Sequence, residues 1–330
     1  MILHLNKDIP KGEVEEIAKE LKALFFHDGE KYVLTNSFRS KKVPSNYESL
    51  VDEQFEFSSD IQLANRQYID DTRSFKIDDI LVGSDNTLLI TGPCSVESES
   101  QIMQCAEFVS GLGLKVLRAG CFKPRTSPYT FQGLGKPGLE LLGQVRKEYD
   151  LKIISEVRDA SHVEEVIEMV DIIQIGAKAM YDQGILRKCG KANKPVLLKR
   201  GFGTTLQEFV QAAEFILSLG NPRVVLCERG IRTFENKTRF TLDLCGVAYL
   251  KKHVNLPIFL DPSHAMGYSY GVPDLTKACV AMGVDGLLIE SHPNPEAALS
   301  DASQQLDFPT FQDLLSSLKP IAKTVNKNLI

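Results

Sequence analysis

Short apolar runs recur along the chain from residue 87 onward, and amphipathic segments separate them. Eight such runs, each rich in Val, Ile and Leu, are TLLITG, KVLRAG, KIISEV, DIIQIG, PVLLKR, RVVLCE, PIFLDP and GLLIES. Apolar runs of this length are typical of strands that are buried on both faces. The intervening segment LQEFVQAAEFILSLG predicts a helix that begins with a capping box of Thr205 and Glu208 and closes at Gly220.

This alternation predicts an α/β fold. Eight strand–helix units in roughly 240 residues match the count and the size of a (β/α)₈ TIM barrel. A doubly wound sheet is the alternative. However, no GxGxxG opens the first unit, and eight regular units fit a closed barrel better.

The first 66 residues follow another pattern, which predicts a small α+β module ahead of a barrel over residues 67–330. The expected elements are a strand in MILHL, an amphipathic helix in KGEVEEIAKELKAL, a hairpin in FFHDGEKYVLTN and a further strand in FEFSS. Asp28 and Gly29 are expected at the hairpin turn. Residues 66–80 are polar and are expected to form a connection.

Composition excludes several classes of partner. The chain has 330 residues, of which 43% are hydrophobic and 25% charged, as in ordinary globular proteins. Its net charge of −5 argues against a nucleic-acid or anionic-membrane partner, and no apolar run is long enough to span a bilayer. The first residues do not have the pattern of a signal peptide, and the seven cysteines form no CxxC pair. We therefore expect reduced thiols and a cytoplasmic location.

Cationic side chains follow several of the predicted strands, at the end of a barrel where active sites lie. They are Arg118, Lys123, Arg125, Lys178, Lys199 and Arg229. Any one of them could be an ordinary ion-pair partner, and Glu228 or Glu156 could pair with Lys199. Their joint placement in an acidic chain predicts a cleft for a small polyanionic substrate.

A second group of side chains at strand ends has the chemistry of metal ligands. Cys94, His264, Glu290 and Asp301 could converge on one divalent ion, and a thiolate, an imidazole and carboxylates suit Mn, Fe, Co or Zn. An isolated buried cysteine is more often a small apolar residue, so the prediction depends on the barrel bringing these positions together.

Long motifs carry a family resemblance over residues 66–310. They are GPCSVES, LRAGCFKPRTSPYTFQG, LLKRGFGTTLQEF, CERGIRTFE, DPSHAMG and IESHPNPEAALSDASQQL. Together they resemble the 3-deoxy-D-arabino-heptulosonate 7-phosphate (DAHP) synthases of the type I beta subgroup. The resemblance implies a (β/α)₈ barrel and a metal-dependent condensation of phosphoenolpyruvate with erythrose 4-phosphate. This reaction is the first step of the shikimate pathway, which leads to chorismate and the aromatic amino acids.

The resemblance also implies roles for individual residues. The metal-ligand positions are Cys94, His264, Glu290 and Asp301. The phosphoenolpyruvate contacts are Arg118, Lys123, Lys199 and Arg229, and the contacts to the sugar phosphate are Arg125 and Thr126. Our own hypothesis for the mechanism adds Lys123 as a proton donor and Glu156 as the residue that orients water, with His264 as the third expected catalytic residue.

One position departs from the family pattern. After IGA the family has an Arg that holds the phosphate of phosphoenolpyruvate, and here Lys178 stands at this position. Lysine keeps the charge but lacks the bidentate fork of arginine. We therefore expect weaker phosphoenolpyruvate binding than in relatives with Arg, or a compensating contact nearby.

Three alternative functions stay open from the sequence. The related octulosonate 8-phosphate synthases take arabinose 5-phosphate, although they replace KPRTS with an Asn-containing motif, so the intact motif favours the four-carbon sugar. A Schiff-base aldolase would use Lys199 as its nucleophile. A non-catalytic barrel is the third alternative, and it should have lost ligand positions that this chain retains.

The first module resembles the ferredoxin-like extension of some members of the subgroup. This implies feedback control by tyrosine or phenylalanine, and the family implies a homotetramer. The alternative is an appendage that stabilises the barrel or forms an oligomer.

Overall fold

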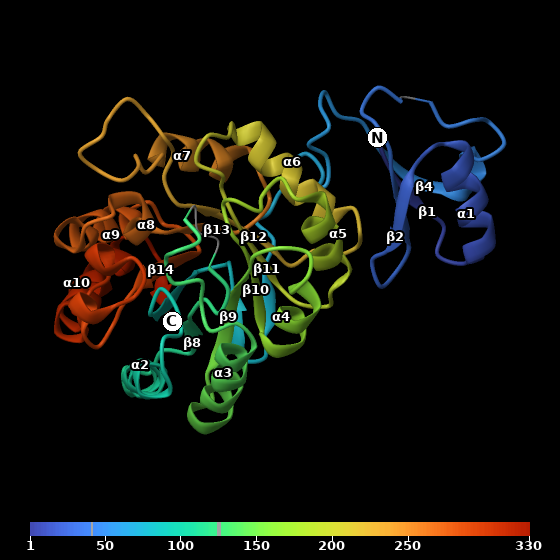
Figure 1. The fold of residues 1–330 in the computed structure, drawn as a ribbon. Coiled ribbons are helices and arrows are strands. Elements are labelled where there is room, and N and C mark those ends of the chain that lie inside the picture. Colours follow the sequence, from blue (N-terminus) through green and yellow to red (C-terminus); the bar gives the residue numbers. More distant parts are fainter. Residues whose placement is uncertain (41, 124–126) are drawn as a thin grey trace.

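A computed structural model describes residues 1–40, 42–123 and 127–330, and in it a closed barrel lies beside a small separate sheet (Figure 1). The parallel barrel strands of the described chain are β7 (Asn86–Gly92), β8 (Val116–Arg118), β9 (Lys152–Val157), β10 (Ile172–Ile175), β11 (Val196–Lys199), β12 (Val224–Glu228), β13 (Ile258–Leu260) and β14 (Gly286–Glu290). Each strand pairs with the next, and β14 pairs with β7, with Glu290 opposite Gly92. The predicted TIM barrel is confirmed, and an open doubly wound sheet is ruled out.

Helices surround the barrel, between successive strands and after the last one (Figure 1). They are α2 (Glu99–Gly111), α3 (Lys136–Tyr149), α4 (Val163–Met169), α5 (Gln183–Lys191), α6 (Leu206–Leu217), α7 (Leu244–His253), α8 (Pro262–Met266), α9 (Val272–Ala281) and α10 (Phe308–Thr324). The capping box of α6 is confirmed, because Glu208 N–H donates to Thr205 Oγ1 and the Glu208 carboxylate accepts from Thr205 N–H. The helix ends at Leu217, three residues before Gly220, whose φ is +89°.

The amino-terminal end of the barrel is covered by a small hairpin that the sequence did not predict. The segment 66–80, expected to be a connection, ends in β5 (Phe75–Ile77), which pairs antiparallel with β6 (Ile80–Val82). Ile77 and Ile80 join the apolar cluster inside the barrel with Ile154 and Phe259. The interior at this end is thus filled with side chains, and the opposite end of the barrel carries the cavity described below.

The amino-terminal module is an antiparallel sheet with one helix. Its elements are β1 (Ile2–Leu5), α1 (Lys11–Glu20), β2 (Leu24–His27), β3 (Tyr32–Thr35), the short 3₁₀ turn η1 (Glu48–Leu50) and β4 (Val51–Phe55). The sheet order β2-β3-β1-β4 is that of a ferredoxin-like module, with a single 3₁₀ turn before the last strand. The hairpin is confirmed, and Asp28 Oδ1 accepts the N–H groups of Glu30 and Lys31 at its turn.

Two predicted boundaries in the module were wrong. The strand expected in FEFSS lies earlier, at Val51–Phe55, where β4 pairs with β1 from Val51 opposite Leu5 to Phe55 opposite Ile2. The helix expected over residues 11–24 ends at Glu20, and the next turn leads into β2.

The central strands β1 and β3 are packed on both faces, because successive side chains of a strand point to opposite faces of the sheet. Leu3 and Leu34 pack with Val14 of α1, whereas Ile2 and Val33 belong to the same apolar cluster as the outer layer of the barrel. The module is therefore docked on the barrel through an apolar contact.

The segment that follows the module is hydrogen-bonded to a barrel helix. Glu214 of α6 accepts the backbone N–H groups of Gln62 and Ala64 at 2.8 Å and that of Leu63 at 3.2 Å. Gln62 also donates its side-chain amide to the Asn36 carbonyl at 2.8 Å. Residues 62–64 thus bridge the module and the barrel. Among the described helices, none is long and apolar enough to cross a membrane.

Candidate active site

A cavity of about 300 Å³ opens at the carboxyl ends of the barrel strands. Its cationic lining consists of Lys123, Lys178, Lys199, Arg229, Arg232 and Arg239. Four of these were predicted from the sequence, and Glu156, His264 and Asp301 line the same space. Arg125 and Thr126, the predicted contacts to the sugar phosphate, lie outside the described residues.

Arg229 has the surroundings of an anion-binding residue. It follows β12, is 4% exposed, and its Nη1 has no hydrogen-bond partner among the described residues. Its guanidinium stacks over the Phe240 ring, 4.4 Å from the centroid, which fixes its plane. A buried guanidinium donor without a partner is costly unless a ligand satisfies it, and phosphate or carboxylate matches its geometry.

Arg232 and Arg239 are cavity residues that the sequence analysis missed. Both lie in the segment between β12 and α7, and the Arg232 guanidinium stacks over Phe202, 4.7 Å from the ring centroid. The motif CERGIRTFE contains Arg232. However, the sequence places only the residues at the end of a strand at the barrel mouth, and Arg232 lies four residues beyond the end of β12. The path of the segment that follows is set by pairing, since Phe240 N–H donates to the Ala265 carbonyl at 2.9 Å.

Lys199 is ion-paired, and its partner differs from the two that the sequence offered. Its Nζ lies 2.6 Å from Oδ2 of Asp261. Asp261 follows β13, which is two strands away from β11 in the barrel. Glu228 instead pairs with Arg200 at 2.8 Å. Burial alone would raise the pKa of Asp261, but His264 and Lys199 hold the pKa of this carboxyl well below its usual range. Lys199 therefore lines the cavity in an ion pair with a buried carboxylate.

Glu156 enters the cavity from β9. Its Oε2 accepts a hydrogen bond from Gln174 Nε2 of β10 at 2.9 Å. Gly176 leaves room for it, because a Cβ at that position would lie 2.1 Å from Glu156 Oε1. The carboxylate is thus held in place at the cavity wall.

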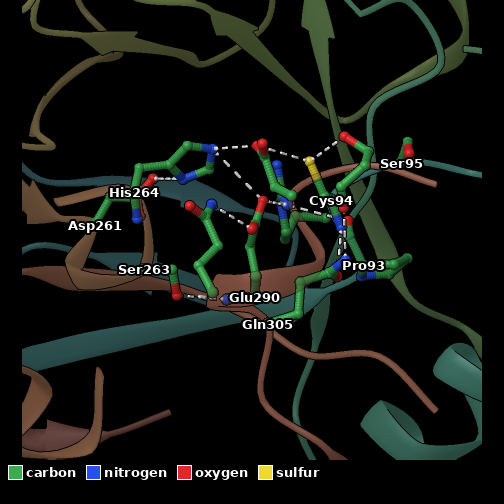
Figure 2. A network of polar contacts seen from close by, with 12 residues as sticks. Pro93, Cys94, Ser95, Asp261, Ser263, His264, Glu290 and Gln305 are labelled. Atoms are coloured by element: carbon green, nitrogen blue, oxygen red, sulfur yellow. Dashed lines mark hydrogen bonds and ion pairs between the residues drawn. The ribbon is translucent and has the colours of Figure 1, made fainter. Parts of the chain in front are cut away.

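The four predicted metal-ligand positions lie together at this cavity, and Figure 2 shows Cys94, His264 and Glu290 among them. Ligand atoms of Cys94, Glu290 and Asp301 lie within 4.8 Å of one another. His264 Nε2 is 3.5 Å from Glu290 Oε1 and 3.8 Å from Asp301 Oδ2. The four residues come from the segments after β7, β13 and β14 and from β14 itself, so only the closed barrel brings them together.

Asp261 positions His264 in this group. Asp261 caps the short helix α8 by accepting the His264 N–H at 2.9 Å, and its other oxygen lies 2.8 Å from His264 Nδ1. Nε2 is the ring nitrogen that faces Glu290 and Asp301 (Figure 2). Burial is the main cause that lowers the pKa of His264, which favours the neutral imidazole that binds metals.

Arg118, predicted to contact phosphoenolpyruvate, is ion-paired with a predicted metal ligand. Its Nη1 lies 2.5 Å from Glu290 Oε1 and donates to the Pro93 carbonyl at 3.0 Å. Burial alone would lower the pKa of Arg118, but the charge of Glu290 outweighs this and raises it. Arg118 therefore neutralises part of the negative charge of the ligand group.

Lys123 contacts Cys94 directly. Its Nζ lies 3.1 Å from both the sulfur and the carbonyl oxygen of Cys94. Burial, and then the charge of Glu290, raises the pKa of the Cys94 thiol to about 12. Burial disfavours the Lys123 ammonium, but Cys94 and Glu156 outweigh this and raise the pKa of Lys123.

This donor set fits a divalent transition metal. It combines one sulfur, one imidazole nitrogen and two carboxylates, a mixture that Mg²⁺ and Ca²⁺ sites do not use. A bound cation would deprotonate the buried thiol outright, so the high pKa of Cys94 is compatible with a ligand role. The arrangement can therefore hold a Lewis acid beside a cavity for anions.

Comparison with known proteins identifies relatives along most of the chain. The model of the DAHP synthetase I family matches residues 60–327. The phospho-2-dehydro-3-deoxyheptonate aldolase of Thermotoga maritima is 45% identical over 261 residues, which cover 79% of this chain and 77% of the relative. A 2-dehydro-3-deoxyphosphooctonate aldolase of Francisella tularensis is 32% identical over 71% of this chain and 90% of the relative.

Solved structures agree with this result. A crystal structure of the Thermotoga maritima phospho-2-dehydro-3-deoxyheptonate aldolase (DAHP synthase) superposes with a TM-score of 0.81 at 36% identity, covering 100% of this chain and 99% of that one. A truncated form of the Thermotoga maritima synthase superposes with a TM-score of 0.76 at 40% identity, covering 81% of this chain and 98% of that one.

Proposed function

Because the chain belongs to the DAHP synthetase I family, we propose that it condenses phosphoenolpyruvate, erythrose 4-phosphate and water to DAHP and phosphate. The observation that carries this proposal is the 45% identity to a curated phospho-2-dehydro-3-deoxyheptonate aldolase. The cationic cavity beside a donor set for a divalent metal supports it, because both substrates are anions. We assign the chain to the type I beta subgroup on the motifs described above.

The proposed metal is one divalent ion, Mn, Fe, Co or Zn, held by Cys94, His264, Glu290 and Asp301. When bound, such an ion supplies Lewis-acid polarisation of the aldehyde carbonyl. Each ligand comes from a segment that barrel closure fixes, so the protein sets the geometry of the site.

The cations of the cavity would bind and orient the two substrates. Lys178, Lys199 and Arg229 are proposed to hold the phosphate and carboxylate of phosphoenolpyruvate. Arg118, which is ion-paired with Glu290, is proposed as a further contact. Arg125 and Thr126 are proposed to hold the sugar phosphate. Holding both substrates in attack geometry removes orientation entropy from the barrier.

In the proposed reaction, C3 of phosphoenolpyruvate forms a bond to the aldehyde carbon of the sugar. The aldehyde oxygen gains a proton, for which Lys123 is the donor, because its ammonium lines the cavity next to Cys94. Water adds at C2, and phosphate leaves by cleavage of the C–O bond. Glu156, fixed by Gln174, is placed to orient that water.

Arabinose 5-phosphate is the alternative sugar, because the curated relatives include several 2-dehydro-3-deoxyphosphooctonate aldolases at 30–32% identity. The motif KPRTS favours erythrose 4-phosphate. A Schiff-base aldolase is less compatible with the structure, because Lys199 Nζ is held 2.6 Å from Asp261 Oδ2 and would have to leave this ion pair to attack a carbonyl.

The deciding experiment offers both sugars to the purified chain. Phosphoenolpyruvate loss is followed with Mn²⁺ present and with either erythrose 4-phosphate or arabinose 5-phosphate. We expect loss with the four-carbon sugar, no loss in Cys94→Ala, and full activity in the matched control Cys245→Ala, since Cys245 is exposed on α7. Preference for arabinose 5-phosphate, or equal activity of the two cysteine variants, would refute the proposal.

We further propose that residues 1–59 form the regulatory module and that residues 60–330 form the catalytic barrel. The hydrogen bonds from residues 62–64 to Glu214 support a boundary before residue 60 instead of after residue 66, and the family match begins at residue 60. An aromatic amino acid is the proposed effector of this module. The homotetramer and the cytoplasmic location are also proposals, supported by the family and by seven unpaired cysteines.

A further inference from the structure

Two consecutive glutamines, Gln304 and Gln305, lie behind the proposed metal ligands. Gln304 is the last residue of the 3₁₀ turn η4 (Ala302–Gln304), and Gln305 follows it. Each side chain is only 1% exposed. A buried amide is tolerated only when its donors and its acceptor are hydrogen-bonded. The bonds of these two side chains lead to two different ligand positions.

Gln304 is bonded to the carboxylate of Glu290. Its Nε2 donates to Glu290 Oε2 at 2.7 Å, and its Oε1 accepts from Arg239 Nη1 at 2.6 Å. The other carboxylate oxygen of Glu290 is held by Arg118. Both oxygens of Glu290 are therefore fixed, and rotation of the carboxylate would break one of these bonds.

Gln305 is bonded to the backbone of Cys94. Its Oε1 accepts the Cys94 N–H at 2.9 Å, and its Nε2 donates to the Ser300 carbonyl at 2.9 Å (Figure 2). The Ser300 hydroxyl in turn lies 3.0 Å from the Cys94 sulfur. The end of β7 is thus tied to the segment that carries Asp301.

We propose that Gln304 and Gln305 are positioning residues for the metal site, one for the carboxylate of Glu290 and the other for the thiolate of Cys94. The inference rests on the metal assigned under the proposed function. Residues that orient metal ligands in this way contribute roughly 10- to 100-fold to metal affinity or activity. The two amides carry no charge, so they fix geometry without adding to the negative charge of the ligands.

Arg239 connects this arrangement to the substrate cavity. It lines the cavity, donates to Gln304 and lies 3.5 Å from Asp301 Oδ1. An anion that draws Arg239 toward the cavity would therefore loosen Gln304, and through it Glu290. Arg239 is thus in contact both with the cavity and with the residues behind the metal ligands.

The test uses Co²⁺ binding to the full-length metal-free protein, measured by competition with a chromophoric chelator and by the thiolate-to-cobalt charge-transfer band. We expect Gln304→Met and Gln305→Met each to weaken Co²⁺ binding by about 10- to 100-fold. Gln305→Met should also weaken or shift the charge-transfer band, because it frees Cys94, and Gln304→Met should leave that band in place. The matched control is Gln312→Met, on the exposed side of α10.

The outcomes separate the inference from the proposed function. A wild-type protein that gives no thiolate-to-cobalt band would refute the metal site itself. A normal wild type, with both variants equal to Gln312→Met, would refute only the positioning role. If Gln304→Met does not fold, Gln304→Glu takes its place in the test. This variant keeps the shape of the side chain and the acceptor for Arg239, but it removes the donor to Glu290. Unchanged Co²⁺ affinity in Gln304→Glu would also overturn the inference.

Discussion

Raising the pH from about 5 to about 8 should weaken the attachment of the module to the barrel through one carboxyl group, that of Glu214. This group accepts three consecutive backbone N–H groups at the seam, and it borders a cavity that Lys22 and Asp60 also line. Burial raises the pKa of Glu214 to about 7, against the opposing effects of the three N–H groups and of Arg73.

The sign follows from proton binding. Between the unfolded pKa of 4.5 and the folded pKa of about 7, the folded protein keeps the Glu214 proton and the unfolded chain has released it. The folded state therefore binds more protons, and the free energy of unfolding falls as the pH rises through this window. The stabilisation is fully present below about pH 4.5 and is lost above about pH 7.

The magnitude has an upper bound. One pKa unit corresponds to about 1.4 kcal/mol, so this shift corresponds to about 3 kcal/mol. Because the side chain borders a cavity that water can enter, we expect a measured value of about 1–3 kcal/mol.

The assay compares wild type with Glu214→Gln in urea unfolding at about pH 5, 6, 7 and 8. Other groups titrate alike in both proteins, so the difference between their free energies of unfolding isolates Glu214. We expect wild type to lose about 1–3 kcal/mol relative to the variant between pH 5 and pH 8. A difference that stays constant across this range would refute the reasoning.

Four further predictions concern the site, the module and the core. Lys178→Arg should lower the Michaelis constant for phosphoenolpyruvate by up to about tenfold, because the bidentate fork adds about 1.4 kcal/mol; steady-state kinetics that show no decrease would contradict this. EDTA should abolish phosphoenolpyruvate consumption until a divalent metal is restored, and borohydride should not trap Lys199; activity that survives chelation, with a trapped adduct, would favour the Schiff-base mechanism. A chain of residues 60–330 should stay active and ignore tyrosine and phenylalanine in a rate assay; a full-length enzyme that already ignores them would remove the regulatory role. Phe259→Ala should lower the free energy of unfolding by about 3–5 kcal/mol, because Phe259 is 2% exposed inside the barrel. The control Phe234→Ala should change the free energy of unfolding little, because Phe234 is fully exposed. Equal costs would show that the interior does not depend on Phe259.

The barrel was predictable because its strands are continuous apolar runs and its helices carry end signals such as Thr205 and Glu208. The hairpin β5–β6 was not predictable, because its three-residue strands contain too few positions for a periodic signal and lie in a polar stretch. Ile77 and Ile80 are apolar, but only the finished barrel provides the interior that they fill.

The candidate site also had a part that the sequence could predict and a part that it could not. Lysine, arginine and cysteine residues at strand ends could be placed by counting strands, and the structure places Lys199, Arg229 and Cys94 at the carboxyl end of the barrel, as expected. Pairings between them could not be read in this way, because the contact of Lys199 with Asp261 joins residues 62 positions apart. Gln304 lies within a motif that carries the family resemblance, but its contact with Glu290 could not be predicted, since an uncharged amide in a loop looks like an ordinary solvated residue.

Closure of the barrel between β14 and β7 also determines when the site can form during folding. The Thr91 hydroxyl donates to the Ile289 carbonyl across this seam, and the two residues are 198 positions apart. A nascent chain that has left the ribosome only as far as α8 has Cys94 and His264 but neither Glu290 nor Asp301, and β7 and β13 each have one open edge. Such distant pairing is slow, and the open edges favour aggregation. A metal that binds all four ligands would then select the closed barrel, so metal supply during synthesis would influence the yield of folded protein.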